Sequence, residues 1–341
     1  MKLSEITTFK IGGEPAGYKT FSSENELREI IKEAENKNLP LRILGGGSNI
    51  LARDRDLQIF IAHNKILGAK SDEDVSRQQS EDGNVFEYQN TQIIQVGAGV
   101  TLDDLVDETT QENLWGLENL KLIPGTVGGA CVQNAGAYGV EIKDALSSVI
   151  VFDTETKTVK ELMNSDCNFA YRESIFKLNK NLIILYAAFS LSKIPKPTLN
   201  YTGLDQLKEL TNLTSLDVAN KVKEIRMNKL PNWKELGTAG SFFKNQIVDE
   251  NKYQELFKLF PELKSHKTGN EHKLYSGQII ELAGFKKGIR EGNVGLYKDN
   301  ALIVVNHGEA TCQEVKLFIK KIVDNVKEKF GIVLEQEVEE L

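Results

Sequence analysis

Cysteine and proline are scarce in this chain, and both shortages limit the class of protein. There are only three cysteines, Cys131, Cys167 and Cys312, and their wide spacing argues against a disulfide scaffold and favours a reducing compartment. No CxxC pair occurs, so we expect no structural zinc site and no bound metal. With only 7 prolines and 40% hydrophobic residues, the chain is expected to fold throughout, without long disordered linkers.

Long apolar runs and basic blocks are also missing. No segment approaches about 18 consecutive apolar residues, and the N-terminal sequence lacks the apolar core of a signal peptide. We therefore expect a cytoplasmic protein that neither crosses nor binds a membrane. The formal net charge is -7, which argues against nucleic acid as a partner. An anionic ligand would have to be held by a few local cations and by backbone N–H groups in a concave site.

The length of 341 residues predicts two or three domains, and the apolar pattern predicts a mixed α+β fold. Ser23 and Glu26 have the spacing of a capping box, which predicts a helix of about four turns that ends before Pro40. The polar, irregular stretch between Lys65 and Asn90 indicates a surface loop or a subdomain boundary. The other predicted elements are helices at 102–110, 215–229, 253–260, 276–282 and 315–330 and strands at 41–44, 92–96, 149–152, 183–191 and 332–338.

Two glycine-rich segments suggest a nucleotide ligand. In the first, a strand ends in Gly45-Gly46-Gly47-Ser48-Asn49, where the backbone can turn tightly and present several N–H donors to one phosphate. The second runs from Pro124 to Gly139 and is rich in small residues, which would let a flat ligand lie against the backbone. A flexible turn and a glycine-rich chain crossing are the alternatives. A Walker loop and a dinucleotide fingerprint are excluded, because their remaining motif residues are absent.

Three further motifs carry groups suited to chemistry. Arg172 offers a planar fork for a carboxylate, although an ordinary ion pair is the commoner role of one arginine. Small residues before Ser241 are expected to place it at an exposed bend, and no nucleophile-elbow motif surrounds it, so a hydrolase is not indicated. A strand at 332–338 would put Glu335 and Glu337 on one face, and we expect this apolar tail to be docked rather than solvated.

Along nearly its whole length the chain resembles the UDP-N-acetylenolpyruvoylglucosamine reductases. The motifs that carry the resemblance are TTFKIGG, LRILGGGSNIL, LENLKLIPGTVGGACVQNAGAYG, YRESIFK, NKLP, GSFFKN and LEQEV. The resemblance implies an FAD-binding fold of the vanillyl-alcohol-oxidase (PCMH) type plus a C-terminal α+β substrate-binding domain. It further implies two FAD-binding subdomains, residues 1–66 and 67–214, and a substrate domain, residues 215–330. Residues 331–341 are candidates to pack back against the second FAD-binding subdomain.

The resemblance also implies an activity and site residues. The activity is reduction of an enolpyruvyl UDP-sugar by NADPH through non-covalent FAD, in peptidoglycan precursor synthesis, and we expect a monomer. Ser241 would donate a proton, while Arg172 and Glu337 would polarise the substrate carboxylate. Tyr201 would cover the substrate diphosphate, as in the subgroup with this loop. Lys229 and Asn245 would bind the UDP portion. The implied FAD-contacting residues are Gly45, Gly46, Gly47, Ser48, Asn49, Pro124, Gly125, Thr126, Gly129, Ala130, Gln133, Asn134, Gly136, Ala137, Tyr138 and Gly139.

The chain departs from the family pattern at three places, and two other functions remain to be weighed. Gln336, Cys131 and Gln246 stand where the family has proline or a small residue. One alternative is an FAD-dependent oxidase with a covalently tethered flavin, but we expect no histidine near either glycine segment, and Cys131 is the only candidate tether. The other is a non-catalytic flavin or nucleotide-sugar binding protein, against which the joint presence of Arg172, Ser241 and Glu337 argues.

Overall fold

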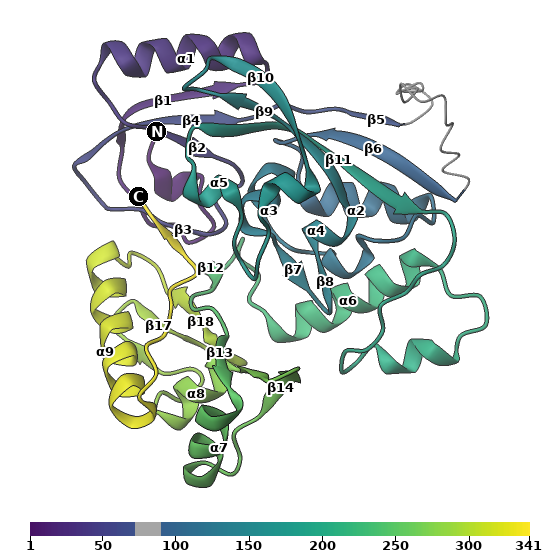
Figure 1. The fold of residues 1–341 in the computed structure, drawn as a ribbon. Coiled ribbons are helices and arrows are strands. Elements are labelled where there is room, and N and C mark those ends of the chain that lie inside the picture. Colours follow the sequence, from purple (N-terminus) through teal and green to yellow (C-terminus); the bar gives the residue numbers. More distant parts are fainter. Residues whose placement is uncertain (72–89) are drawn as a thin grey trace. The chain divides into compact units, whose positions relative to one another are not determined.

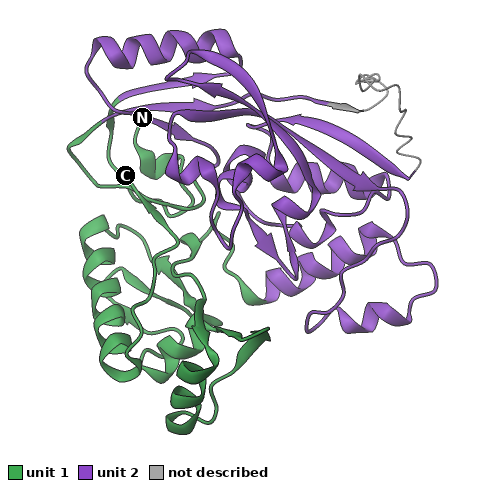
Figure 2. Cartoon of the chain, in the orientation of Figure 1, with its two compact units in different colours: residues 1–16, 47–58, 229–341 green, residues 17–46, 59–228 purple. Residues whose placement is uncertain are grey.

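The computed structural model describes residues 1–71 and 90–341. Contacts along the chain divide it into two compact units (Figure 2). Unit 1 comprises residues 1–16, 47–58 and 229–341, and unit 2 comprises residues 17–46 and 59–228. Most of the predicted polar loop between Lys65 and Asn90 lies outside the described residues. In the described part of the chain, no helix combines the length and the apolar character needed to cross a membrane.

Unit 2 contains a small sheet with one parallel pair of strands. The sheet has the order β1-β4-β2 and consists of β1 (Pro15–Phe21), β2 (Leu41–Leu44) and β4 (Leu57–Asn64). β2 and β4 are parallel, and Leu44 lies opposite His63. α1 (Glu24–Asn36) begins as predicted, because the Ser23 side chain accepts a hydrogen bond of 3.3 Å from the Glu26 N–H. Figure 1 shows α1 alongside this sheet, where it buries Leu27, Ile30 and Ala34.

The larger sheet of unit 2 is antiparallel, and its central strand is buried on both faces. The order β10-β9-β11-β6-β5 is formed by β5 (Ala69–Ser71), β6 (Thr91–Gly97), β9 (Leu146–Asp153), β10 (Thr158–Met163) and β11 (Leu182–Ser192). In β11, Ile183 and Leu185 join the core beneath α1, whereas Ile184 and Phe189 join a second core. Burial on both faces explains why this strand is almost continuously apolar in sequence.

Short helices and a hairpin carry the second glycine-rich segment over the second core. They are α2 (Leu102–Gln111), η2 (Glu118–Leu120), α3 (Val127–Gln133), β7 (Gly136–Ala137), β8 (Val140–Glu141), α4 (Ile142–Ala145), η3 (Asn164–Cys167) and α5 (Ile175–Leu178). The unit ends with η4 (Asp205–Glu209) and with α6 (Ser215–Lys229), which packs against the segment 199–207. This packing holds α6 in unit 2 up to Asn228.

Unit 1 is a separate α+β body. One sheet has the order β12-β18-β17-β16 and consists of β12 (Gly237–Ser241), β16 (Arg290–Glu291), β17 (Val294–Tyr297) and β18 (Asn300–Asn306). A second has the order β13-β15-β14 and consists of β13 (Gln246–Asp249), β14 (Ser265–Thr268) and β15 (Glu271–Leu274). The remaining elements are η1 (Leu3–Glu5), β3 (Ile50–Leu51), α7 (Glu250–Leu259), α8 (Ser276–Leu282), α9 (Cys312–Phe330) and β19 (Glu339–Glu340). α8 and α9 cover one apolar core with the first sheet.

The predicted helices are confirmed within a few residues, but the predicted strand at 332–338 is wrong. That segment forms only one isolated bridge, at Gln336, and the terminal strand is the two-residue β19, which pairs in parallel with β3. The tail is nevertheless docked, as predicted, since the Leu341 N–H donates to the Leu51 carbonyl at 3.0 Å and the Leu341 carbonyl accepts the Arg53 N–H at 2.9 Å. The division of the chain at residues 66 and 214 stays a prediction.

Candidate active site

The two glycine-rich segments meet in unit 2. A Cβ atom on Gly45 would come within 2.5 Å of the Thr126 Oγ1, and one on Gly46 within 2.6 Å of the Gly125 Cα. Real Cβ atoms essentially never approach so closely, so both positions require glycine. Two segments 80 residues apart in sequence therefore expose adjoining backbone, which is the arrangement predicted for a shared ligand.

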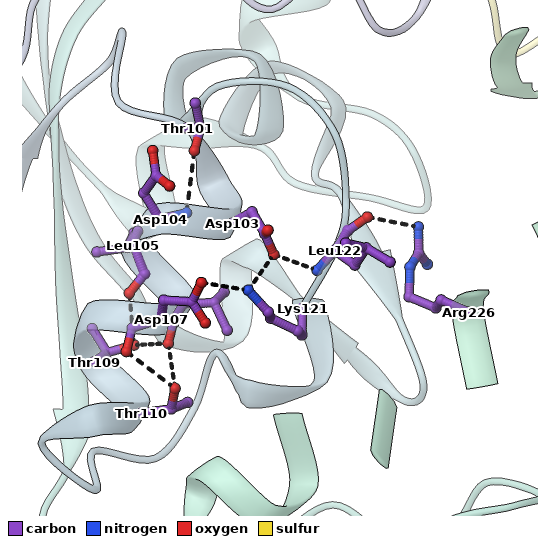
Figure 3. A network of polar contacts seen from close by, with 11 residues as sticks. Thr101, Asp103, Asp104, Leu105, Asp107, Thr109, Thr110, Lys121, Leu122 and Arg226 are labelled. Carbon is purple, nitrogen blue, oxygen red and sulfur yellow. Dashed lines mark hydrogen bonds and ion pairs between the residues drawn. The ribbon is translucent and has the colours of Figure 1, made fainter. Parts of the chain in front are cut away.

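A buried ion cluster fixes the entry into the second segment (Figure 3). Lys121 is 4% exposed, and its Nζ lies 2.8 Å from the Asp103 Oδ1 and 2.6 Å from the Asp107 Oδ2. Burial disfavours the charge of Lys121, but the two carboxylates outweigh it and raise the pKa of the lysine. Asp103 also accepts the Leu122 N–H at 2.7 Å, and Leu122 has a φ of 65°. The cluster thus holds the left-handed turn that directs the chain into Pro124.

α3 and its two ends present both satisfied and unsatisfied polar groups. The Thr126 side chain caps α3 by accepting the Gly129 N–H at 3.4 Å. Asn134 ends the helix with a φ of 43° and is fully buried, and its side chain bonds Glu141, Ala170 and Lys143. We therefore expect Asn134 to shape the loop rather than to contact a ligand through its side chain. The Gln133 Oε1, in contrast, is buried without a hydrogen-bond partner among the described residues.

Arg172 is anchored to the second segment. Its Nη2 donates to the Gly136 carbonyl at 2.7 Å, and its Nη1 lies 3.4 Å from the Asn134 carbonyl oxygen and 3.9 Å from the Glu141 carboxylate. The residue has a φ of 57°, and Lys177 donates to its carbonyl at 2.8 Å. The guanidinium is thereby held beside the loop predicted to bind FAD, with 18% of the side chain exposed.

Tyr201 lies in the same unit and is 43% exposed. Its ring meets the edge of the Tyr138 ring, with 4.7 Å between centroids and an interplanar angle of 71°. Tyr138 belongs to the second glycine-rich segment, so the predicted diphosphate-covering residue and a predicted FAD-contacting residue are neighbours.

Ser241 ends β12 at a bulge. The register of β12 against β18 shifts between Thr238 and Ser241, and Gly240 has a φ of 78° with no atom near its missing Cβ. The Thr238 Oγ1 accepts the Gly240 N–H at 3.1 Å and donates to the Val304 carbonyl at 2.9 Å. The predicted bend is present, but the prediction that it is exposed is wrong, because the turn leaves Ser241 half-buried.

The C-terminal tail places Glu337 beside the residue that follows Ser241. The Glu337 N–H donates to the Phe242 carbonyl at 2.9 Å, and the Lys244 N–H donates to the Glu335 carbonyl at 2.9 Å. The Glu335 side chain is exposed, and its carboxylate pairs with Lys244 at 2.5 Å, whereas Glu337 is half-buried. Neither backbone bond uses the N–H of Gln336, so the family's proline would keep both and lose only the bond of 2.7 Å from the Gln336 side chain to the Val338 carbonyl.

Asn49 connects the first glycine-rich segment to this tail. Its Nδ2 donates to the Glu337 carbonyl at 3.0 Å, and its carbonyl accepts the Glu339 N–H at 3.0 Å. Gly47 has a φ of 63° and accepts the Thr8 N–H at 3.0 Å. The segment 47–49 and the tail are therefore held together in unit 1.

The two predicted UDP-binding residues, Lys229 and Asn245, also belong to unit 1. Lys229 is the exposed last residue of α6. Asn245 follows Ser241 by four residues, and its Oδ1 accepts the Ser276 N–H at 3.0 Å at the start of α8. Ser241, Asn245 and Glu337 thus lie in one unit, and Arg172 and Tyr201 lie in the other.

His63 is a residue near the site that the sequence reasoning missed. The expectation that no histidine lies near a glycine-rich segment is wrong, because parallel pairing of β2 and β4 sets His63 opposite Leu44, directly before Gly45. Its Nδ1 bonds the Tyr18 hydroxyl at 2.7 Å, and its Nε2 is buried. Burial lowers the pKa of His63 to about 4, helped by the charge of Lys65. The residue is only 5% exposed, which argues against a covalent flavin tether.

Known proteins similar to this chain place these features in a family. An FAD binding domain matches residues 15–161, and the C-terminal domain of UDP-N-acetylenolpyruvoylglucosamine reductase matches residues 231–341. The UDP-N-acetylenolpyruvoylglucosamine reductase of Flavobacterium johnsoniae is 40% identical over 98% of this chain and 97% of its own length. That of Photobacterium profundum is 35% identical over 98% and 93%. The structure of the Thermus caldophilus enzyme is 25% identical, with a TM-score of 0.66 over 100% of this chain and 97% of its own.

These matches agree with the geometry of the residues present. The close backbone approach of Gly46 and Gly125 and the Gln133 Oε1, which has no partner in the part of the chain that the structure describes, fit a flavin nucleotide. The matched FAD binding domain contains all three residues. The predicted fold, FAD as cofactor and NADPH as reductant are confirmed. The chain therefore belongs to the UDP-N-acetylenolpyruvoylglucosamine reductases, the FAD-dependent enzymes of peptidoglycan precursor synthesis that use NADPH as reductant.

Proposed function

We propose that Arg172, Ser241 and Glu337 are the catalytic residues with which this chain reduces UDP-N-acetylglucosamine enolpyruvate to UDP-N-acetylmuramate. We further propose that the protein acts as a cytoplasmic monomer of the subgroup with the tyrosine loop. FAD, held by the two glycine-rich segments, would supply the transfer of a hydride from NADPH to the β-carbon of the enol ether. The substrate then carries negative charge at the α-carbon, and that charge spreads into its carboxylate. The residues of the chain must stabilise this charge and supply a proton.

Arg172 is suited to bind the carboxylate. Because its guanidinium is held by the Gly136 carbonyl at 2.7 Å, its orientation is fixed before the substrate binds. An oriented cation stabilises developing charge more effectively than a mobile one, since no reorganisation is needed during the reaction. Arg172 would thus lower the energy of the enolate-like species as the hydride arrives.

Ser241 would then protonate the α-carbon. A serine hydroxyl is a weak acid, so it helps only when neighbouring groups stabilise the alkoxide that forms. The turn built by Thr238 and Gly240 fixes the position of Ser241, which supports this role.

The position of Glu337 gives the strongest support for the three catalytic roles, because two segments distant in sequence hold its backbone. The Phe242 carbonyl accepts its N–H, and the Asn49 side chain binds its carbonyl. The backbone of Glu337 is therefore hydrogen-bonded to the residue that follows Ser241. We propose that it orients the substrate carboxylate or shares its proton.

The remaining roles concern binding. We propose that the residues from Gly45 to Asn49 and from Pro124 to Gly139 hold FAD, mostly through their backbone. Tyr201 would donate its hydroxyl to the substrate diphosphate, and Lys229 and Asn245 would bind the UDP portion. The exposure of Tyr201 and of Lys229 supports a role in binding a ligand from solvent.

Stopped-flow measurement of the two half-reactions tests the proposal. Ser241→Ala should leave flavin reduction by NADPH near the wild-type rate and slow flavin reoxidation by the sugar nucleotide at least about a hundredfold, the lower range of positioned general-acid catalysis. Ser190→Ala, at a half-buried position near the end of β11, serves as a control and should change neither rate. Equal slowing of both half-reactions, or unchanged reoxidation, would refute the role of Ser241.

A further inference from the structure

Tyr138 is held in a backbone conformation that needs support. Its φ is 51°, and the following Gly139 has a φ of 85°. A left-handed conformation is unfavourable for an aromatic residue and persists only where surrounding contacts determine it. The contacts around Tyr138 therefore indicate what its position is needed for.

Asn119 holds the backbone of Tyr138 to the segment that leads to Tyr201. The Asn119 side chain is fully buried, and its Nδ2 donates both to the Tyr138 carbonyl at 2.8 Å and to the Thr198 carbonyl at 2.9 Å. A Cβ on Gly139 would lie 3.1 Å from the Thr198 Cγ2, so the two segments are also in close contact. One amide group thus ties the Tyr138 turn to a point three residues before Tyr201.

Arg226 holds the other end of Tyr138. Burial raises the pKa of the Tyr138 hydroxyl, and the nearby guanidinium of Arg226 opposes that rise by its charge and by hydrogen bonding. The Arg226 Nη2 lies 3.4 Å from the Leu122 carbonyl oxygen (Figure 3). The Arg226 Nε is buried and has no hydrogen-bond partner among the described residues. Burying an arginine with one donor unsatisfied is costly, so its position at this junction calls for a functional explanation.

The Tyr138 ring supports Tyr201 on an otherwise exposed loop. The two rings meet edge to face at 4.7 Å, and the loop is further attached through Leu204, which packs with Val218 and Val222 of α6. The Leu204 N–H also donates to the Tyr201 carbonyl at 2.9 Å. Tyr201 therefore rests on a ring whose backbone and hydroxyl are both fixed.

We propose that Tyr138 and Arg226 are positioning residues that hold Tyr201 ready to bind the diphosphate of the sugar nucleotide. The inference rests on the proposed role of Tyr201 and adds the residues on which that role depends. A preorganised side chain loses less conformational freedom when the ligand binds, so the benefit appears in affinity. The contact to a diphosphate persists through the reaction, so KM should change and kcat should not.

A double-mutant cycle tests the coupling. Tyr201→Phe alone should raise the KM for the sugar nucleotide. Tyr138→Phe and Arg226→Lys should each raise it on the order of three- to tenfold, the loss expected for one or two hydrogen bonds. In the Tyr201→Phe background both substitutions should have less than about a twofold effect, because no hydroxyl remains to be positioned. Lys223→Arg, on the exposed side of α6, is the matched control and should leave KM unchanged.

Hydrogen exchange of the free holoenzyme gives a readout that does not depend on turnover. Exchange at the Leu204 amide should be faster in Tyr138→Phe and in Arg226→Lys than in wild type, and unchanged in Lys223→Arg. If Arg226→Lys does not fold, Tyr138→Phe carries both measurements.

The outcomes separate this inference from the proposed function. Additive effects on KM in the cycle would overturn the inference while leaving the role of Tyr201 intact. Loss of flavin, or slower flavin reduction by NADPH, in Tyr138→Phe and Arg226→Lys would also overturn it, since these residues would then act on FAD. An unchanged KM in Tyr201→Phe would refute the diphosphate role. In that case Leu204 exchange alone decides whether Tyr138 and Arg226 hold the loop.

Discussion

Gly46→Ala should weaken FAD binding although it adds a single methyl group. The new Cβ would lie 2.6 Å from the Gly125 Cα, 3.1 Å from the Gly125 carbonyl carbon and 3.3 Å from the Thr126 nitrogen. All three atoms belong to backbone, so no side chain can rotate away. The two segments must separate by about 0.8 Å to reach the 3.4 Å at which ordinary contact begins.

The size of the effect follows from the cost of overpacking. Forcing a methyl group into such a contact costs about 1–3 kcal/mol. In the free protein the segments can move apart, and FAD must bring them together again, so the cost appears in the dissociation constant. It corresponds to an increase in the Kd of FAD of about 5- to 150-fold. Titration of the apoprotein with FAD, followed by quenching of flavin fluorescence, measures this constant.

A control position separates the steric effect from the loss of glycine itself. Gly277 lies within α8, where a Cβ would have its nearest neighbours at 3.5 Å, so Gly277→Ala should leave the Kd of FAD unchanged. A Kd for Gly46→Ala within about twofold of wild type would show that the two segments do not act together, and the FAD assignment of Gly45 to Gly47 would fail.

Three further predictions concern stability. Lys121→Met should lower the free energy of unfolding, measured in urea, by about 3 kcal/mol. This is the low end for a broken buried ion pair, because Asp103 and Asp107 are partly hydrated. A loss below about 1 kcal/mol would contradict the role of the cluster. The pKa of His63 is about 4 in the folded protein, against an ordinary value of 6.5, so between these pH values the unfolded chain binds the proton more readily. As the pH falls from 6.5 to 4, the free energy of unfolding of wild type should therefore fall by up to about 3 kcal/mol. His63→Gln should remove that pH dependence. Gln336→Pro should keep the melting temperature within a few degrees, because it removes none of the backbone bonds that hold the tail and only the side-chain bond of Gln336 to the Val338 carbonyl. A clear drop would refute this reasoning.

Local signals in the sequence predicted most helices and several central strands. Ser23 and Glu26 identify the start of α1 because capping depends on residues three apart, and the apolar spacing of α9 ends at Gly331, which has the left-handed φ of 63° typical of a helix end. The same reasoning found β11 from its apolar run. These features depend on residues close together in the sequence, so a single sequence is enough to predict them.

Local signals failed where structure depends on distant partners. The tail from Ile332 to Val338 has an apolar alternation that predicts a strand, yet only Gln336 finds a partner there, because Phe242 to Lys244 offers two backbone bonds and no more. His63 was missed for a similar reason: its proximity to Gly45 results from parallel pairing of β2 with β4, and the spacing of residues along the chain cannot reveal which strands pair.

The tail also shows why a wrongly predicted element need not overturn the proposed site assignment. A regular strand would have turned Glu335 and Glu337 to one face, and both would have been candidates for the acid. The single bridge instead separates them: Glu335 is exposed and paired with Lys244, whereas Glu337 is half-buried and bonded through its backbone to Phe242 and Asn49. The irregular backbone thus makes the two glutamates inequivalent. Of the two, Glu337 is therefore the one whose loss should affect catalysis, while loss of Glu335 should affect mainly the burial of the Lys244 charge.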